Sequence, residues 1–292
     1  MKIIKWLKKI YNKLFPHPDY EMIQLKRHWK ELETRGYTIA ALMLQGSQNY
    51  GLQEYSQDYW SDIDSKAIVL PTFKDFCLNK KPISTTIILD NNEHIEVKDI
   101  RIMFDMFKKE NISYIELLFT KWKIINPRYK KYMNQIFAHA NAIAAYNSNQ
   151  FVKCLAGMAM EKRKALCHPY PTLIDKIEKY GFDGKQLSHC ARLYEFLSKF
   201  YCGVPLEECY RASDIQSLVN MKKQLTPAGD RIMTKEEAIE MCDKLNDAIG
   251  VLKNKYLERG NEISEQVLPL LDSICYKVLK KKFRRDLWIR NW

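Results

Sequence analysis

The strand-like segments of this sequence lie before residue 100, and this distribution limits the fold more than any other feature. Four short apolar runs have this character: residues 38–45, 64–70, 85–90 and 93–98. The last two flank Asn91-Asn92, and because asparagine tolerates a positive φ angle, the pair is typical of a β-hairpin. From about residue 128 onward the apolar residues recur at helical spacing instead.

Helices are predicted over most of the remaining chain. Thr234 and Glu237 can form a capping box for the clearest helix, and Gly36 fits the end of an early one. Ser113 and Glu116 also match the capping-box pattern, so we expect Glu116 to be structural. The predicted helices span residues 2–15, 19–35, 99–109, 129–146, 148–166, 184–202, 211–224, 235–258 and 261–283.

These elements predict an α+β fold with three regions. Basic helices occupy residues 1–35, a mixed sheet with flanking helices occupies 36–127, and an all-helical region with a basic tail occupies 128–292. Because no low-complexity linker separates the last two regions, we expect them to pack against each other.

The net charge of +12 comes mainly from the two ends of the chain. Residues 1–15 contain five lysines and no acid, and residues 277–292 contain seven lysines and arginines and one aspartate. Such ends favour a polyanionic partner, either nucleic acid or an anionic membrane surface. The amphipathic pattern of residues 2–15 fits a helix that packs on the protein or lies on a membrane surface.

Aromatic residues alternate with cations in the C-terminal tail, where Phe283, Trp288 and Trp292 lie among lysines and arginines. This mixture suits single-stranded nucleic acid, through base stacking and phosphate pairing, and we expect RNA to bind through the basic termini. The alternative is a terminal helix whose aromatic side chains pack on the protein while its charges face water.

The composition favours a cytoplasmic protein. No run of about 18 uncharged apolar residues occurs, which argues against a transmembrane segment, and the lysines scattered through the N-terminus do not match a signal peptide. The eight cysteines include no C-x-x-C pair, which favours reduced, mostly buried thiols over a zinc site or a disulfide scaffold.

Three features of the α/β region fit one chemistry. Gly46-Ser47 follows the apolar run 38–45, and a glycine there lets backbone N–H groups approach a phosphate chain. Asp62 and Asp64 open the next strand on one face, because residues i and i+2 of a strand point the same way. On the hairpin strand, Glu96 is expected on the open face.

Paired carboxylates in this arrangement suit Mg²⁺, with Mn²⁺ as an alternative. Two such ions about 4 Å apart can activate a hydroxyl and stabilise a leaving pyrophosphate. Taken alone, an Asp-x-Asp motif is more often a solvated turn or a helix cap, and a Gly-Ser pair is more often a simple turn. Their order along the chain, followed by an acid-bearing hairpin, favours the catalytic interpretation.

The stretch LQGSQNYGLQEYSQDYWSDIDSKAIVLP resembles the signature of the DNA polymerase beta-like nucleotidyltransferase superfamily. The blocks GSQNYGL, SDIDSKAIVLP, KDIRIMF, NISYIELLF and GFDGKQLSHCARLYEFL resemble the predicted nucleotidyltransferases associated with RNA repair, which also occur in phages. The resemblance covers about residues 38–205. One departure is the spacer of 14 residues between Ser47 and Asp62, which is slightly longer than usual.

The resemblance implies a nucleotidyltransferase-type sheet and a Mg²⁺-dependent transfer of a nucleotide from an NTP to a hydroxyl, with an RNA end as the expected acceptor. Gly46 and Ser47 would bind the β- and γ-phosphates, and Asp62 and Asp64 would hold the metal ions. Glu96 would be the third carboxylate, which binds metal and helps to activate the acceptor hydroxyl.

Further residues carry predicted roles with open alternatives. Asp99 competes with Glu96 as the third carboxylate, although its position at a helix start also fits an N-cap. Lys66 is a candidate phosphate contact or a solvated strand-edge lysine. The resemblance implies that Lys185, His189 and Arg192, at i, i+4 and i+7, hold triphosphate oxygens. Alternatively, Lys185 and Arg192 are surface residues and His189 is a packing residue.

Two alternative functions remain open. The same chemistry could modify a protein, a small molecule or another nucleotide as a signal. A catalytically inactive fold could instead serve as a nucleic-acid or membrane-surface binding module. The presence of both Gly46-Ser47 and the Asp62/Asp64 pair favours an enzyme, because a purely structural relic has no physical need for two converging acids.

Overall fold

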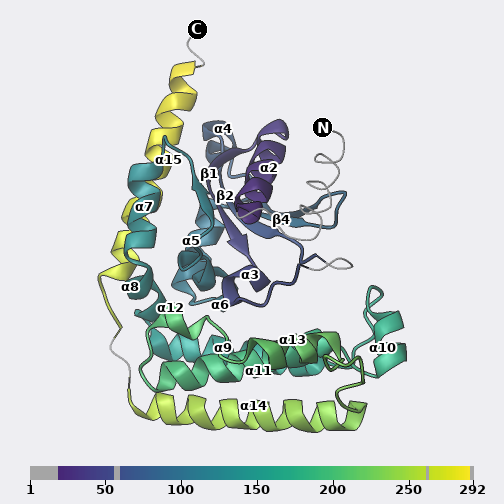
Figure 1. Ribbon diagram of the computed structural model, residues 1–292. Coiled ribbons are helices and arrows are strands. Elements are labelled where there is room, and N and C mark those ends of the chain that lie inside the picture. Colours follow the sequence, from purple (N-terminus) through teal and green to yellow (C-terminus); the bar gives the residue numbers. More distant parts are fainter. Residues whose placement is uncertain (1–18, 56–59, 261–262, 290–292) are drawn as a thin grey trace, which may run out of the picture. The chain divides into compact units, whose positions relative to one another are not determined.

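Figure 1 shows the computed structural model of the chain, which describes residues 19–55, 60–260 and 263–289. The predicted helix over residues 2–15 lies outside the described residues. The chain divides into two compact units, and each is described by itself. The first comprises Met1–Asn49, Gln53–Tyr146 and Ser264–Trp292, and the second comprises Tyr50–Leu52 and Asn147–Ile263.

A five-stranded mixed sheet forms the centre of the first unit, with the strand order β3-β4-β2-β1-β5. β1 pairs antiparallel with β2 and β5, β3 pairs antiparallel with β4, and β2 and β4 run parallel. The strands are β1 (Thr38–Gln45), β2 (Asp64–Leu70), β3 (Ser84–Ile88), β4 (His94–Asp99) and β5 (Lys123–Ile125).

The four predicted strands are confirmed, including the hairpin turn, where Asn92 has a φ angle of 63°. β1 and β2 are buried along almost their whole length, which means that side chains cover both faces of the sheet there. This double burial explains why both strands are nearly continuous apolar runs. β5 was not predicted, since three residues are too few to show an alternation.

Helices cover the sheet on both sides. α2 (Tyr20–Thr34) packs on one face through Leu25 and Leu32, which join a core with Leu42, Ala67 and Val97. α5 (Ile100–Lys108) packs against β2 and β4 through its own apolar residues. The first unit also contains most of α3 (Ser47–Tyr50), whose last residue belongs to the second unit. Its remaining helices are α4 (Phe73–Cys77), α6 (Ile112–Ile115), η1 (Glu116–Leu118), α7 (Lys130–Ala138), α8 (Ala140–Ala145) and α15 (Val267–Ile289).

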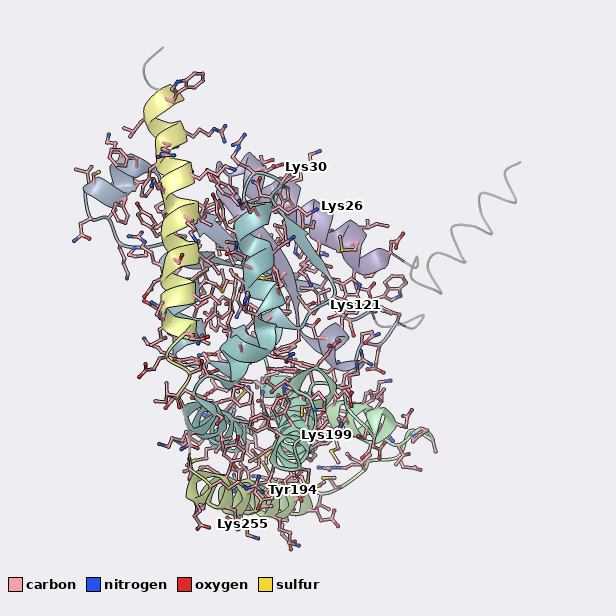
Figure 2. The ribbon with its side chains drawn as sticks, turned by 90° about the vertical axis from the view of Figure 1, so that its left-hand side faces the viewer. Lys26, Lys30, Lys121, Tyr194, Lys199 and Lys255 are labelled. Atoms are coloured by element: carbon pink, nitrogen blue, oxygen red, sulfur yellow. The ribbon has the colours of Figure 1, made fainter. Side chains whose placement is uncertain are left out.

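α15 joins the first unit and packs beside α7, as Figures 1 and 2 show. The ring centroid of Phe283 lies 5.5 Å from that of Phe73 and 5.1 Å from that of Phe76 on α4. Asp286 accepts a hydrogen bond of 3.0 Å from the backbone N–H of Phe73. The helical region after residue 128 is therefore shared between both units.

The second unit is entirely helical. α11 packs against α9, α13 and α14 and forms its centre. The predicted capping box of Thr234 and Glu237 at the start of α14 is confirmed. Its helices are α9 (Ser148–Ala165), α10 (Ile174–Tyr180), α11 (Gly184–Tyr201), α12 (Leu206–Cys209), α13 (Ile215–Lys223) and α14 (Lys235–Glu258).

Several local predictions need correction. The capping box at Ser113 and Glu116 was wrong, because Asn111 caps α6 and accepts the N–H of Ser113 at 3.1 Å. The predicted helix 129–146 is interrupted at His139, and the predicted helix 261–283 begins and ends about six residues later. The eight cysteines carry free thiols, of which three are buried: Cys190, Cys209 and Cys242.

The predicted α+β class is confirmed as a mixed sheet with flanking helices followed by a largely helical C-terminal part. Across the described part of the chain, the helices are either too short or too polar to cross a membrane.

A close approach of α11 to α13 makes Gly184 a sensitive position. A Cβ atom there would lie 2.0 Å from the carbonyl oxygen of Met221. We expect Gly184→Ala to lower the free energy of unfolding by about 1–3 kcal/mol, because the two helices must separate. Urea denaturation measures the change.

Gly250→Ala on α14 is the matched control, since no atom lies within 4 Å of its added Cβ. This change should raise the free energy of unfolding by up to about 1 kcal/mol through helix propensity. A Gly184→Ala protein as stable as the wild type would contradict the close approach.

Candidate active site

The Gly-Ser turn joins β1 to the short helix α3. Gly46 has a φ angle of 114°, a conformation that residues with a Cβ rarely adopt. Gln48 then donates from Nε2 to the backbone carbonyl of Asp62 at 3.0 Å. The turn is therefore tied directly to the segment that carries the aspartates.

The two aspartates lie on the accessible side of this segment. Ser61 and Ile63 are buried, whereas Asp62 is exposed and the Asp64 side chain is 41% exposed. This alternation agrees with the predicted shared face, although the strand begins at Asp64 rather than at Asp62. Asp64 Oδ1 accepts the backbone N–H of His94 at 2.9 Å and lies 3.2 Å from His94 Nδ1.

Glu96 lies on the same face of the sheet as Asp64. On β4, Ile95 and Val97 are fully buried, whereas His94 and Glu96 are partly exposed, which agrees with the open face expected for Glu96. The parallel register sets Lys66 opposite Glu96. Asp64 and Glu96 therefore lie on one face of two neighbouring strands, and His94 contacts Asp64.

The buried side chain of Lys66 contacts the partly exposed carboxylate of Glu96. Its side chain is 1% exposed, and its Nζ lies 3.1 Å from Glu96 Oε2. The same Nζ donates to the carbonyl of Ser113 at 3.2 Å and lies 3.8 Å from the ring centroid of Tyr114. Burial lowers the pKa of Lys66, and the negative charges of Glu96 and Glu116 oppose that change.

The strand-edge alternative for Lys66 was wrong, because β2 lies between β1 and β4 and the side chain is buried. The predicted phosphate contact stays a prediction. What the structure places around this ammonium is a carboxylate, a carbonyl and an aromatic ring of the protein itself.

Asp99 is engaged elsewhere. Its side chain is buried and accepts the backbone N–H of Arg101 at 2.9 Å, which confirms it as the N-cap of α5. The guanidinium of Arg101 adds two contacts, at 2.9 and 2.8 Å, one to each carboxylate oxygen. These contacts favour Glu96 over Asp99 as the third carboxylate.

The donor types of this site fit a hard divalent cation. Asp62 and Asp64 present accessible carboxylate oxygens, which Mg²⁺ prefers. Among the described residues, no three His, Cys, Asp or Glu side chains are grouped closely enough to form a complete metal centre. Glu96 Oε2 instead lies 3.1 Å from Lys66 Nζ.

The predicted phosphate-binding residues of α11 lie in the second unit. Lys185 is exposed, whereas Arg192 is 5% exposed, so the surface alternative for Arg192 was wrong. The Arg192 guanidinium stacks on the ring of Tyr50 at 3.7 Å, and its buried Nε has no hydrogen-bond partner. Tyr50 itself is buried and packs.

Cations surround His189. Burial lowers the pKa of His189 well below its usual value, and the charges of Arg192, Lys162 and Lys185 lower it further. His189 is therefore neutral at neutral pH. We call Lys162, Lys185, His189 and Arg192 the α11 cationic cluster, and its excess positive charge suits an anion.

A buried polar cluster was missed at the sequence level. His28 of α2 is fully buried, with Nδ1 2.8 Å from Ser65 Oγ and Nε2 2.9 Å from Glu93 Oε2. Arg27 also contacts Glu93. A hydroxyl, an imidazole and a carboxylate are linked by hydrogen bonds, as in a catalytic triad, but all three side chains are buried. The cluster therefore connects α2 to the sheet and does not face a substrate. Its one sequence signal is that His28 falls on the apolar stripe of α2, between Leu25 and Leu32.

Comparison with protein-family models, with curated proteins and with solved structures finds no match for this chain.

The buried cluster predicts a pH dependence of stability. Burial alone would raise the pKa of Glu93, but hydrogen bonds from His28 and Asn91 and the charge of Arg27 outweigh it and lower this pKa. The ionised carboxylate therefore stabilises the fold above the unfolded-state pKa of about 4.3, and this contribution is lost as the pH falls through the lower folded-state pKa.

Glu93→Gln should therefore lower the free energy of unfolding at neutral pH by roughly 1–3 kcal/mol and weaken the loss of stability below about pH 4.3. Urea denaturation over a pH series measures both effects. Glu240→Gln, at the exposed pair with Lys244, is the control and should change stability by less than about 0.5 kcal/mol. An unchanged pH profile in Glu93→Gln would show that this carboxylate is not the linked group.

Proposed function

We propose that this chain is a Mg²⁺-dependent nucleotidyltransferase that transfers a nucleotide from an NTP to a hydroxyl at an RNA end, and that its sheet is of the nucleotidyltransferase type. The observation that carries the proposal is the pairing of β2 with β4, by which Asp64 and Glu96 share one accessible face next to the Gly46-Ser47 turn. Two oxygen-donor carboxylates and a third acid on the neighbouring strand suit this reaction.

In the proposed reaction, the oxygen of the acceptor hydroxyl forms a bond with the α-phosphorus of the NTP. The bond from that phosphorus to the bridging oxygen breaks, and pyrophosphate leaves with the electron pair. The hydroxyl proton passes to the carboxylate of Glu96, a general-base role. The backbone at Gly46-Ser47 binds the β- and γ-phosphates, and Asp62 and Asp64 hold Mg²⁺, which supplies charge neutralisation at the phosphate oxygens.

Lys66 supports Glu96 in this proposal. Its ammonium lies 3.1 Å from Glu96 Oε2, and this contact orients the carboxylate. Because Lys66 is itself held by Ser113 and Tyr114, it also fixes where Glu96 lies. A phosphate contact of Lys66 is the alternative role.

The α11 cationic cluster supports a phosphate-binding role for Lys185, His189 and Arg192. A neutral imidazole can donate one hydrogen bond, and the Arg192 Nε donor is buried without a partner. Phosphate oxygens would satisfy both donors and neutralise the surrounding charge.

Substitution of Asp62 and Asp64 tests whether they are required for nucleotide transfer. The wild type is incubated with each labelled NTP, Mg²⁺ and one candidate acceptor at a time: RNA, transfer RNA, protein or none. We expect label on RNA, and we expect Asp62→Asn/Asp64→Asn to reduce the transfer to background, because the oxygen ligands for the cation lose their charge.

The matched control is Asp90→Asn/Asp105→Asn, which removes the same charge from two exposed positions of the first unit. Transfer that survives in Asp62→Asn/Asp64→Asn would contradict the assignment. Label on a protein or in a soluble nucleotide would favour the alternative acceptors, and no NTP consumption with any acceptor would favour the binding-module alternative.

A second pair of variants distinguishes Glu96 from Asp99 as the third carboxylate. Glu96→Gln should lower kcat by about 10²–10⁴-fold where the protein is folded, as expected for loss of a general base. It should also lower the melting temperature, because the buried Lys66 ammonium loses its carboxylate partner. Asp99→Asn should lower the melting temperature, since the Arg101 guanidinium loses its buried ionised partner, but should retain kcat where the protein is folded. Retained kcat in Glu96→Gln together with a loss of kcat in folded Asp99→Asn would instead make Asp99 the third carboxylate.

A further inference from the structure

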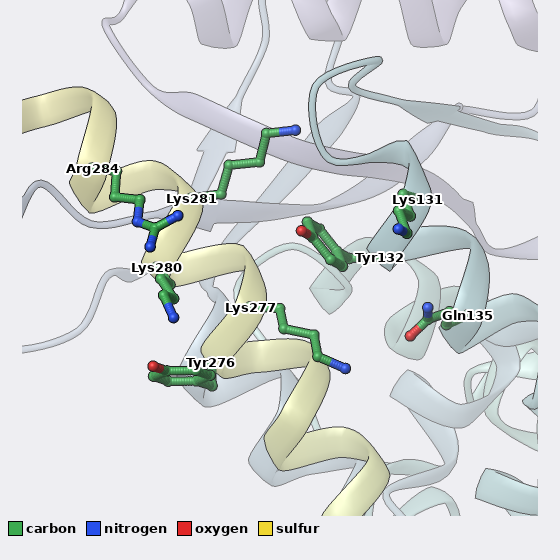
Figure 3. A pocket seen from close by; sticks show the side chains of 8 residues that line it. All are labelled: Lys131, Tyr132, Gln135, Tyr276, Lys277, Lys280, Lys281 and Arg284. Carbon is green, nitrogen blue, oxygen red and sulfur yellow. The ribbon is translucent and has the colours of Figure 1, made fainter. Parts of the chain in front are cut away.

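A cationic groove runs between α7 and α15 of the first unit, and Figure 3 shows its side chains. Its volume is about 600 Å³. α7 contributes three of the lining residues and α15 contributes five. They are Lys131, Tyr132, Gln135, Tyr276, Lys277, Lys280, Lys281 and Arg284.

The positive charge of this groove has no acidic counterpart in its lining. Five of its residues are cations and none is an acid. The two acids of α15 pair elsewhere, since Asp272 contacts Lys108 at 2.6 Å and Asp286 contacts Lys282 at 2.5 Å. Within the described ranges, the groove therefore keeps a net positive charge that attracts a polyanion.

The helical spacing of α15 produces this arrangement. Leu271, Ile274 and Val278 are fully buried and attach the helix to the rest of the unit. The opposite side carries Tyr276, Lys280, Arg284 and Trp288 at successive intervals of four residues, so these side chains are neighbours along one row. Two cations thus lie between two aromatic residues about 18 Å apart along the helix.

Exposed aromatic rings distinguish this surface from a simple basic patch. Tyr276 is 60% exposed and Trp288 is 70% exposed. Across the groove, the Tyr132 ring lies between the helices, 6.0 Å from Lys281 Nζ, and Gln135 offers an amide (Figure 3). Bases stack on such rings while cations pair with the phosphates, which is how proteins bind single strands.

We propose that the groove between α7 and α15 binds single-stranded RNA, with phosphates on Lys277, Lys280 and Arg284 and bases stacked on Tyr276 and Tyr132. This inference rests on the proposed function, because it identifies the surface that binds the RNA acceptor. Unpaired bases are required, since the bases of a duplex are stacked on one another and not available to the rings. Among the described residues, the lining of the groove contains no aliphatic side chain of the kind that inserts into a membrane.

The test compares two triple variants that each remove three positive charges. Lys277→Gln/Lys280→Gln/Arg284→Gln changes the groove, and Lys26→Gln/Lys30→Gln/Lys255→Gln changes exposed lysines elsewhere (Figure 2). The probe is a fluorescent uridine-rich RNA oligonucleotide, measured without NTP or Mg²⁺ at several salt concentrations. We expect the groove variant to bind at least about tenfold more weakly and to lose about 2 from the log–log salt slope, at roughly 0.7 per phosphate contact. The control variant should bind like the wild type.

Tyr276→Ala tests the stacking contribution. We expect it to weaken binding by about fivefold or more without a change in the salt slope, because it removes no charge. Tyr194→Ala, at an exposed tyrosine of α11, is the matched control and should leave binding unchanged (Figure 2).

Three results would overturn the inference: a groove variant with wild-type affinity, an equal loss in both triple variants, or tighter binding of duplex RNA or phosphatidylglycerol vesicles than of the single strand. The same titration with Asp62→Asn/Asp64→Asn separates this inference from the proposed function. RNA binding that persists in a protein without transfer activity supports the groove independently. If the protein transfers nucleotides to RNA but the groove variant binds RNA as tightly as the wild type, the groove is not the RNA-binding surface, and the proposed function is unaffected.

Discussion

The parallel pairing of β2 with β4 is the constraint on which the candidate site depends. Ser65 lies opposite Ile95 and Lys66 opposite Glu96, so a shift of the register by one residue would turn the acids of one strand toward the core. The buried cluster of Ser65, His28 and Glu93 connects α2 to β2 and to the residue just before β4, next to this pairing. Its hydrogen bonds lie on the opposite side of β2 from Asp64 and Lys66. Polar contacts on one face of the sheet thus stabilise the register, and the candidate site lies on the other face.

A buried lysine beside a partly exposed carboxylate links stability to the proposed reaction. Burial of an ammonium is unfavourable, and the Lys66 side chain is accommodated because Glu96, the Ser113 carbonyl and the Tyr114 ring each interact with its charge. An apolar residue at this position would avoid that penalty. The charge is better explained by what it does to Glu96, which it holds in one place on the accessible face.

The regular elements were largely predictable because their signals are local. β1 and β2 begin and end where the sequence predicts, and α14 begins at its predicted capping box. Apolar periodicity and helix caps each depend on only a few neighbouring residues. The Asp99 N-cap could be anticipated in the same way.

Contacts between residues that are distant in the sequence could not be predicted. The contact of Lys66 with Glu96, the burial of Arg192 on Tyr50 and the groove of α7 with α15 join residues from 30 to about 150 positions apart. The false capping box at Ser113 shows the limit of local signals, because Asn111 satisfied the same N–H.

Nucleotidyl transfer is the central claim, and the position of the label in ATP tests it most directly. The wild type is incubated with Mg²⁺, single-stranded RNA and ATP that carries the radioactive phosphorus at either the α or the γ position. The account predicts that the α label appears on the RNA and that the γ label appears in pyrophosphate. Label from the γ position on the RNA would mean phosphoryl transfer instead, and would contradict the proposed roles of Asp62, Asp64 and Glu96.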